Sequence, residues 1–301
     1  MTSRWWVYQR ERFPVLAHGV LIGAFSFAGV SYPAALRDVR GAPEPRIVFV
    51  AFLTAFLFFL QLRLLDEFKD YEEDAAYRPY RPVPRGLVTL RELGWVGVAA
   101  AAVQLALSFW IHPRLPAVLV GVWCYLGLMR VEFFASAWLK ERPTLYAGSH
   151  MIIVPLIALY VTACDWISKG SGMPAGLEWF LLTSFFNGLV IEFGRKIRAP
   201  QDEEPGVPTY SQAWGVRVAI VAWLAALAAT AACGVGAATR IGVGLPIGLA
   251  VITMMTLATA LARDFVRQPL SRGARWIEHL SGGWALLLYL ILGSAPAISR
   301  L

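Results

Sequence analysis

Acidic side chains cluster in one short segment that directly follows an apolar stretch. Asp66, Asp70 and Asp74 are spaced by four residues, so on a helix they project from one face. Three carboxylates on one face repel each other unless cations neutralise them. Hard oxygen ligands suit Mg²⁺, which takes one or two protein carboxylates and completes its coordination with water and phosphate oxygens. The spacing therefore predicts a metal site for a phosphorylated substrate.

Basic residues follow the acids and end in a turn at Gly86. Arg78, Arg81 and Arg85 alternate with prolines, and guanidinium groups bind phosphate oxygens in a fixed fork geometry. The alternative is a solvated, charged helix end with Lys69 paired to Glu73. The acid spacing, the apolar entry and the Arg-Pro repeats together favour a phosphate site.

A second polar segment, residues 192–212, also begins where an apolar stretch ends. Glu192, Arg195 and Arg198 share a helix face, and Lys196 follows Glu192 by four residues. We expect the three basic residues to hold a diphosphate, with Asp202 and either Glu192 or Glu203 completing the site. The alternative is that the basic residues only anchor the chain at the membrane edge.

Four further residues carry polar groups near the ends of the apolar stretches or within them. Lys140 and Arg142 lie in one short connection, for which a plain basic loop is one interpretation. His150 lies inside an apolar stretch, where it could accept a proton, although a histidine bonded to a neighbouring helix is commoner. Glu132 is expected to pair within the bundle, because an unpaired charge near the membrane is costly.

Apolar stretches of membrane-spanning length must position these residues. The 301-residue chain is 57% hydrophobic and only 16% charged, which excludes a disordered or ordinary soluble protein. Its three cysteines form no zinc or disulfide pattern, and there is no nucleic-acid motif. We therefore predict one all-α domain over residues 1–301, a polytopic membrane helix bundle with about nine spans near residues 15–36, 46–65, 92–111, 115–134, 143–164, 177–195, 213–235, 241–262 and 276–298.

The basic residues are divided unequally between the two sides of this bundle. Of 27 Lys and Arg residues, 20 fall on the side that carries the N-terminus and the connections 63–91 and 192–212. The positive-inside rule places that side in the cytoplasm and the C-terminus outside. The net charge of +7 is thus an orientation signal and part of the predicted phosphate site.

Both polar segments resemble the motifs of the UbiA superfamily of membrane prenyltransferases. The first motif, Asn-Asp-x-x-Asp-x-x-x-Asp followed by Arg-Pro and Gly, matches Asp66, Glu67, Asp70 and Asp74, with Arg81-Pro82 and Gly86 downstream. In the second motif, Asp202 takes the second Asp and Gly206/Thr209 match its ending. Arg198 stands where the family has the first Asp. The segment 138–144 is a variant of the family's Tyr-x-x-x-Lys-Arg-x-Thr segment.

The resemblance implies a nine-helix bundle with a central cavity open to lipid, an isoprenyl diphosphate substrate, and Mg²⁺. It assigns metal binding to Asp66, Glu67, Asp70, Asp74 and Asp202, with Asp66, Asp70, Asp74 and Asp202 catalytic. It assigns diphosphate binding to the basic residues Arg78, Arg81, Lys140, Arg142, Arg195, Lys196 and Arg198.

Two outcomes for the prenyl group remain open. The family's usual reaction transfers it to a lipophilic acceptor such as an aromatic ring, which we favour. The alternative is a UbiA-type terpene cyclase, in which the cation is captured within the same molecule. A transporter ranks last, because the polar residues are concentrated on one side of the predicted bundle.

Overall fold

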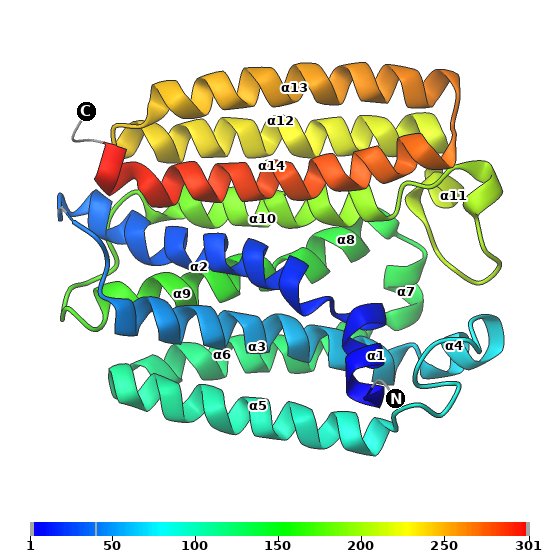
Figure 1. Cartoon of the computed structure of the whole chain (residues 1–301), viewed down its shortest axis with the longest axis horizontal. Helices are drawn as coiled ribbons and strands as arrows, with labels where there is room; N and C mark the ends of the chain where they lie inside the picture. Colours follow the sequence, from blue (N-terminus) through cyan, green and yellow to red (C-terminus); the bar gives the residue numbers. More distant parts are fainter. Residues whose placement is uncertain (1–2, 40, 299–301) are drawn as a thin grey trace.

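The computed structural model describes residues 3–39 and 41–298, and within these ranges every regular element is a helix. Long helices run side by side along one direction (Figure 1). Their bounds are α1 Arg4–Arg12, α2 Val15–Leu36, α3 Pro45–Lys69, α4 Tyr71–Tyr77, α5 Leu90–Ile111, α6 Leu115–Arg130, η1 Glu132–Phe134, α7 Ser136–Lys140, α8 Pro143–Met151, α9 Ile153–Trp166, α10 Leu177–Arg195, η2 Pro200–Asp202, α11 Tyr210–Trp214, α12 Val216–Arg240, α13 Gly244–Arg267 and α14 Ser271–Ile298.

Local sequence signals account for the starts of two long helices. α3 begins with Pro45, whose fixed backbone angle suits a first helical position. α5 begins with a capping box, in which the Thr89 hydroxyl accepts from the Glu92 amide and the Glu92 carboxylate accepts from the Thr89 amide. The capping box therefore starts α5 directly after the first polar segment.

The helices pack around a core that runs through the bundle. α10 contacts α12 and α14, α2 contacts α14, α3 and α9, and α3 also contacts α5. Large side chains fill this core, among them Trp223, Trp284 and Tyr160. At Gly194, near the end of α10, a Cβ atom would clash with the Ser281 side chain of α14. The glycine therefore lets these two helices meet next to the second polar segment.

Seven helices of the described chain are long and apolar enough to cross a membrane. They include α8 and α9 counted as one unit, Pro143–Trp166, although the structure divides it at Ile152. The predicted fourth span is shorter, since α6 ends at Arg130, and α10 is not among the seven. The prediction of a polytopic helix bundle is confirmed, but the count of nine is not.

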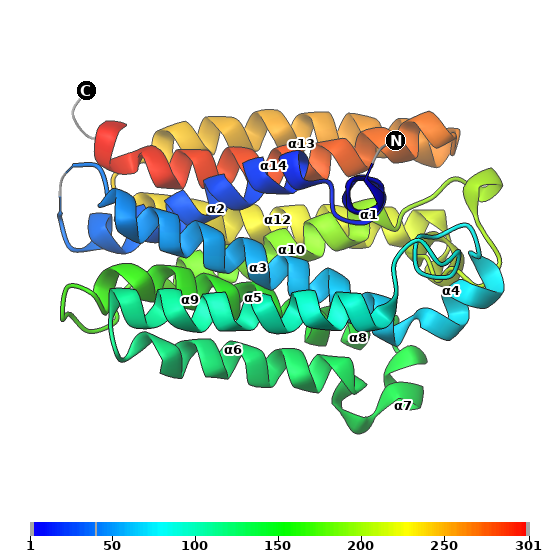
Figure 2. The same ribbon diagram turned by 60° about the horizontal axis from the view of Figure 1, so that its bottom comes forward.

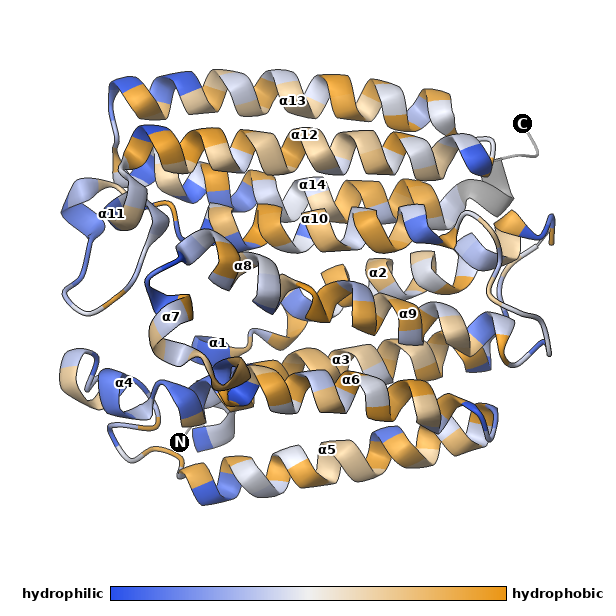
Figure 3. Cartoon of the chain, turned by 180° about the vertical axis from the view of Figure 1, so that it is seen from behind, coloured by the Kyte–Doolittle hydropathy of each residue, from blue (hydrophilic) through white to orange (hydrophobic). Residues whose placement is uncertain are grey.

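The outer faces of the bundle are apolar, as expected for a protein surrounded by lipid (Figure 3). On α13, for example, Leu245, Leu249 and Ile252 are all exposed. Hydrophilic residues gather instead at one end, over the short helices α1, α4, α7 and α11 (Figure 3). Figures 1 and 2 show the short helices α1, α4 and α7 at this end of the bundle. Since α3 and α10 both end there, the two polar segments predicted from the sequence lie at the same end.

Candidate active site

Asp66 and Asp70 lie at the end of α3, and their carboxylates have little neutralising charge around them. Arg63 is 3.7 Å from Asp66, whose side chain is 42% exposed. Asp70 has no ion pair within the described chain. Burial raises the pKa of Asp70 above its usual value, and the nearby Asp66 charge adds to the rise, although Lys69 opposes it. Two acids that need a cation match the ligand set that Mg²⁺ takes from proteins.

Glu67 and Asp74 are buried carboxylates that arginines already neutralise. Arg78 is 2.6 Å and Arg81 2.7 Å from the Asp74 oxygens. Arg12 of α1 pairs with Glu67 and lies 3.8 Å from Asp74. Because their charge is already balanced, these two acids have less reason to bind a cation than Asp66 and Asp70.

The polypeptide bends at Asp70, so Asp74 lies on a different helix from Asp66 and Glu67. α3 ends at Lys69 and α4 begins at Tyr71, with Asp70 at the junction. The expected single helix face carrying Asp66, Asp70 and Asp74 is therefore interrupted at Asp70. The Asp74 carboxylate lies among arginine side chains. The spacing of the acids did not predict these contacts.

The end of α10 carries the second polar segment. Buried Glu192 accepts from Arg195 at 2.6 Å and from Lys196 at 2.8 Å, as the helical spacing predicted. The backbone of α11 is tied to it, because the Tyr210 amide donates to the Lys196 carbonyl. The Arg198 amide donates to the Ser211 hydroxyl at 2.7 Å. The Arg198 guanidinium has no side-chain partner within residues 3–39 and 41–298, so it is free to bind a ligand.

A polar cavity of about 460 Å³ lies beside this segment. It brings Asp202 together with Arg195 and Arg198, as the motif predicted. Asp202 accepts a hydrogen bond from Ser271 of α14 at 2.9 Å. Glu203 accepts instead from Thr209. The cavity therefore has both signs of charge and is suited to a polar ligand.

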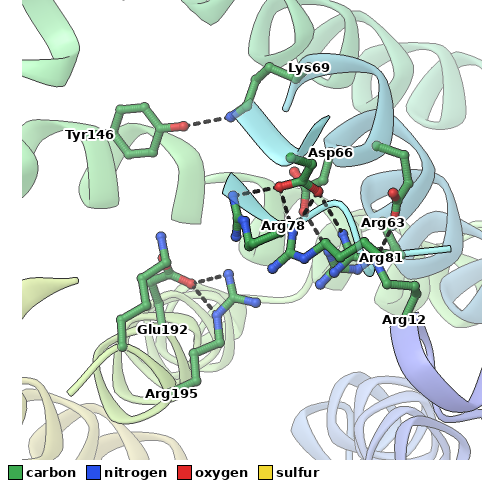
Figure 4. Close-up of polar contacts among 12 residues, drawn as sticks. Arg12, Arg63, Asp66, Lys69, Arg78, Arg81, Tyr146, Glu192 and Arg195 are labelled. Atoms are coloured by element: carbon green, nitrogen blue, oxygen red, sulfur yellow. Dashed lines mark hydrogen bonds and ion pairs between the residues drawn. The ribbon is translucent and has the colours of Figure 1, made fainter. Parts of the chain in front are cut away.

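The two segments face each other across the end of the bundle. Figure 4 shows the Arg195 guanidinium pointing from α10 toward Asp66, Arg78 and Arg81. The Asp66 carboxylate lies close enough to Arg195 to act on it electrostatically. A substrate phosphate between α3 and α10 would thus meet positive charge from α10 and carboxylates from α3.

The segment 138–144 lies further from this centre. Lys140 is 3.3 Å from exposed Glu73 of α4. Arg142 stacks on Trp138, with its guanidinium carbon 4.6 Å from the ring centroid. Among the described residues, neither side chain forms a hydrogen bond or ion pair with the ends of α3 or α10, so the structure does not bring them together with the other predicted phosphate ligands.

No preformed carboxylate cage for a metal ion exists among the described residues. Within residues 3–39 and 41–298, no three His, Cys, Asp or Glu side chains are close enough to hold an ion between them. The predicted five-member set of Asp66, Glu67, Asp70, Asp74 and Asp202 is therefore not assembled. Asp66 and Asp70 alone still fit Mg²⁺, because this ion completes its coordination with water and substrate oxygens.

Two sets of site residues were missed by the sequence reasoning. Arg12 was not among the predicted site residues, but it is buried against Glu67. The Lys69 ammonium donates to the Tyr146 hydroxyl at 2.6 Å and lies 3.5 Å from Glu132. The expected internal pairing of Glu132 is thereby confirmed. The Lys69–Glu73 pair of the alternative interpretation, a solvated helix end, is absent from the described ion pairs, since Glu73 instead meets Lys140.

A family comparison identifies the protein class. The sequence model of the UbiA prenyltransferase family matches residues 16–294. The chain belongs to the UbiA prenyltransferase family. The resemblance drawn from the two motifs is confirmed, and the divergent Arg198 lies within the matched region.

Curated relatives of this UbiA member match over part of their length. Digeranylgeranylglyceryl phosphate synthase of Thermococcus kodakarensis is 29% identical over 114 residues, 37% of this chain and 38% of that protein. The Thermococcus gammatolerans protein of the same name is 32% identical over 107 residues, 36% of each chain. The matched region thus covers well under half of the length of each of these relatives.

Solved structures of UbiA homologues share the fold of the whole chain. The apo homologue from Aeropyrum pernix K1 has a TM-score of 0.67 at 13% identity, covering 94% of this chain and 98% of that one. The homologue from Archaeoglobus fulgidus, bound to DMAPP and Mg²⁺, has a TM-score of 0.56 at 13% identity, covering 95% and 98%. At such identity the likeness shows the bundle and says nothing of individual ligands.

Proposed function

We propose that this UbiA member is a membrane prenyltransferase that ionises an isoprenyl diphosphate with Mg²⁺. The observation that carries the proposal is the pair Asp66 and Asp70, in which Asp70 has no ion pair within the described residues and Asp66 has only Arg63 at 3.7 Å, across from the basic end of α10. Departure of diphosphate leaves an allylic cation and a highly charged anion. Fixed positive charge around the leaving group therefore lowers the barrier.

Each part of the site has a separate task in this proposal. Asp66 and Asp70 hold Mg²⁺, which supplies positive charge to the phosphate oxygens when bound. Arg195, Lys196 and Arg198 bind the diphosphate, and Asp202 orients this side of the cavity. Arg78 and Arg81 keep free N–H donors beyond their bonds to Asp74, since a guanidinium has five. The apolar helices bind the prenyl tail.

Transfer to a second molecule is the reaction we favour over cyclisation. The curated relatives are named as synthases of a digeranylgeranylglyceryl phosphate, a product in which prenyl groups are joined to a glyceryl phosphate. That name supports a lipophilic acceptor, and it adds a lipid hydroxyl to the aromatic ring as an acceptor class. The test therefore includes both.

We further propose that the polar end of the bundle faces the cytoplasm. The excess of Lys and Arg on the connections at this end supports that orientation. A diphosphate does not cross a bilayer unaided, so the orientation decides which side supplies the substrate.

Purified protein in sealed vesicles tests these proposals together. With C10 to C20 prenyl diphosphates, Mg²⁺ and either acceptor class, we expect diphosphate release and a prenylated acceptor, seen by mass spectrometry. EDTA should abolish both, and added Mg²⁺ should restore them. Only vesicles with the cytoplasmic side outward should use added substrate. A cyclic hydrocarbon formed without acceptor would refute transfer, and no turnover of any prenyl diphosphate would refute the function.

Arg198→Gln should raise the KM for prenyl diphosphate about tenfold with a smaller effect on kcat. One charge-assisted hydrogen bond to an ionised group contributes about 1.5–3 kcal/mol, and partial exposure reduces it. The matched control is Arg217→Gln, an exposed arginine at the start of α12, which should behave as wild type. An unchanged KM in Arg198→Gln would show that this arginine only anchors the chain at the membrane edge.

A further inference from the structure

One buried histidine near the site has a ring nitrogen without a partner. His150 of α8 is only 7% exposed, and its Nε2 atom has no hydrogen-bond partner in the described structure. A polar atom buried in this way normally finds a partner in the folded protein. An unpartnered nitrogen is therefore a position where a ligand group can bind.

The other nitrogen of the ring determines which form the imidazole takes. His150 Nδ1 is 2.9 Å from the backbone carbonyl oxygen of Tyr146. A carbonyl only accepts, so Nδ1 carries the proton and donates it to that oxygen. In the neutral ring, Nε2 then presents its lone pair. The residue is set up as a proton acceptor and not as a donor.

Several contacts hold the ring in place. It stacks on the Tyr146 ring, with centroids 4.0 Å apart and planes 15° from parallel. The Phe133 ring meets it edge-on at 5.8 Å. Phe133 and its neighbours Glu132 and Phe134 all have positive φ angles, which non-glycine residues rarely adopt. The chain thus takes an unfavourable backbone form at the turn that covers this ring.

His150 lies next to the end of α3, one helical turn deeper in the bundle. Tyr146 bonds Lys69, the residue before Asp70 (Figure 4), so α8 borders the metal-binding end of α3. His150 lies one turn further along α8 and therefore about 6 Å deeper in the bundle. The reacting carbon of a prenyl diphosphate is the first atom beyond the phosphates toward the tail. With the phosphates held at the end of α3, this carbon would lie on the side of the phosphates toward His150.

The neighbouring acid is a weaker candidate for the same task. Burial opposes ionisation of Glu132, but a hydrogen bond from Ser136 and the charges of Lys69 and Lys140 lower its pKa below the usual value. A carboxylate held ionised by an ammonium group is a poor base. The neutral imidazole is thus the base that remains available.

We propose that His150 is the general base that takes the proton from the acceptor. The inference rests on the proposed function but not on the acceptor class, because both a hydroxyl and an aromatic ring lose one proton on prenylation. The bond from the prenyl C1 carbon to the diphosphate oxygen breaks, and its electron pair leaves with diphosphate. The acceptor atom bonds to C1 and its proton passes to Nε2. The imidazolium releases that proton to water after the product leaves.

His150→Asn tests the proposal, because its side-chain amide can still donate to the Tyr146 carbonyl while Nε2 is lost. We expect prenyl transfer to fall between 10²- and 10⁴-fold, the range for loss of a general base. Diphosphate release should fall less than tenfold, with prenyl alcohol replacing the prenylated acceptor. His279→Asn, an exposed histidine of α14, is the control. If His150→Asn does not fold, His150→Gln is measured with the same expectation.

Two results would overturn the role of His150. Transfer within threefold of wild type would show that no base is needed there. Equal losses of transfer and diphosphate release would assign the residue to ionisation or structure. Both differ from failure of the proposed function itself, in which the wild-type protein releases no diphosphate from any prenyl substrate.

Discussion

Asp70→Asn is expected to lower kcat/KM for the prenyl diphosphate about 10³-fold while the protein stays folded. The asparagine has the same shape but no charge, so Mg²⁺ loses half of its protein carboxylate charge. Removing one group that stabilises a developing anion costs about 10²–10³-fold in known sites. A metal ligand also helps to bind the substrate, so the expected loss in kcat/KM lies at the upper end of that range.

The stability of this variant should not fall together with its activity. Because the pKa of Asp70 is raised in the folded chain, its ionised form is less favourable there than in the unfolded chain. A neutral amide removes this cost, so Tm should be unchanged or higher. Thermal unfolding and Mg²⁺-dependent turnover, measured on the same preparation, separate the two effects.

The matched control for Asp70→Asn is Glu72→Gln, which changes an exposed acid of α4 two residues away. This variant should keep wild-type turnover and the wild-type Mg²⁺ dependence. If Asp70→Asn retained more than a tenth of wild-type turnover, the metal site would have to be placed elsewhere. A large fall in Tm would instead show that Asp70 has a structural partner.

The sequence predicted the end of α3 as the chemical centre because its spacing and its apolar entry are local features. Asp66 and Asp70 are four residues apart, and this spacing can be read directly from the sequence. The pairing of Glu192 with Arg195 and Lys196 was predictable for the same reason. Contacts within one helix follow from its geometry.

Contacts between helices could not be read in this way. Arg12 reaches Glu67 across 55 positions of the chain, and Lys69 reaches Tyr146 across 77. Both depend on how α1 and α8 pack against α3, which periodicity does not specify. His150 was noticed in the sequence as a polar residue in an apolar stretch. Its unpartnered Nε2 and fixed tautomer became visible only with the fold.

Asp74→Asn should destabilise the protein by about 3–5 kcal/mol, the cost of breaking one side of a buried ion pair. The Asp74 side chain is only 2% exposed, and Arg78 and Arg81 both bond to it. An asparagine leaves these two guanidiniums without their carboxylate in a buried place. The free energy of unfolding in detergent micelles measures the effect. Asp264→Asn, an exposed acid of α13, provides the control and should change it by less than about 0.5 kcal/mol.

The activity of the Asp74 variant distinguishes an arginine anchor from a metal ligand. If Asp74 acts through the arginines, turnover per folded molecule should fall far less than in Asp70→Asn, and the Mg²⁺ concentration for half-maximal activity should stay the same. Adding Arg81→Met to Asp74→Asn should recover part of the lost stability, because one unpaired buried charge is then removed. A wild-type unfolding free energy combined with a changed Mg²⁺ dependence would show that Asp74 is a metal ligand. In that case the arginine pairs seen here would have to open when substrate binds.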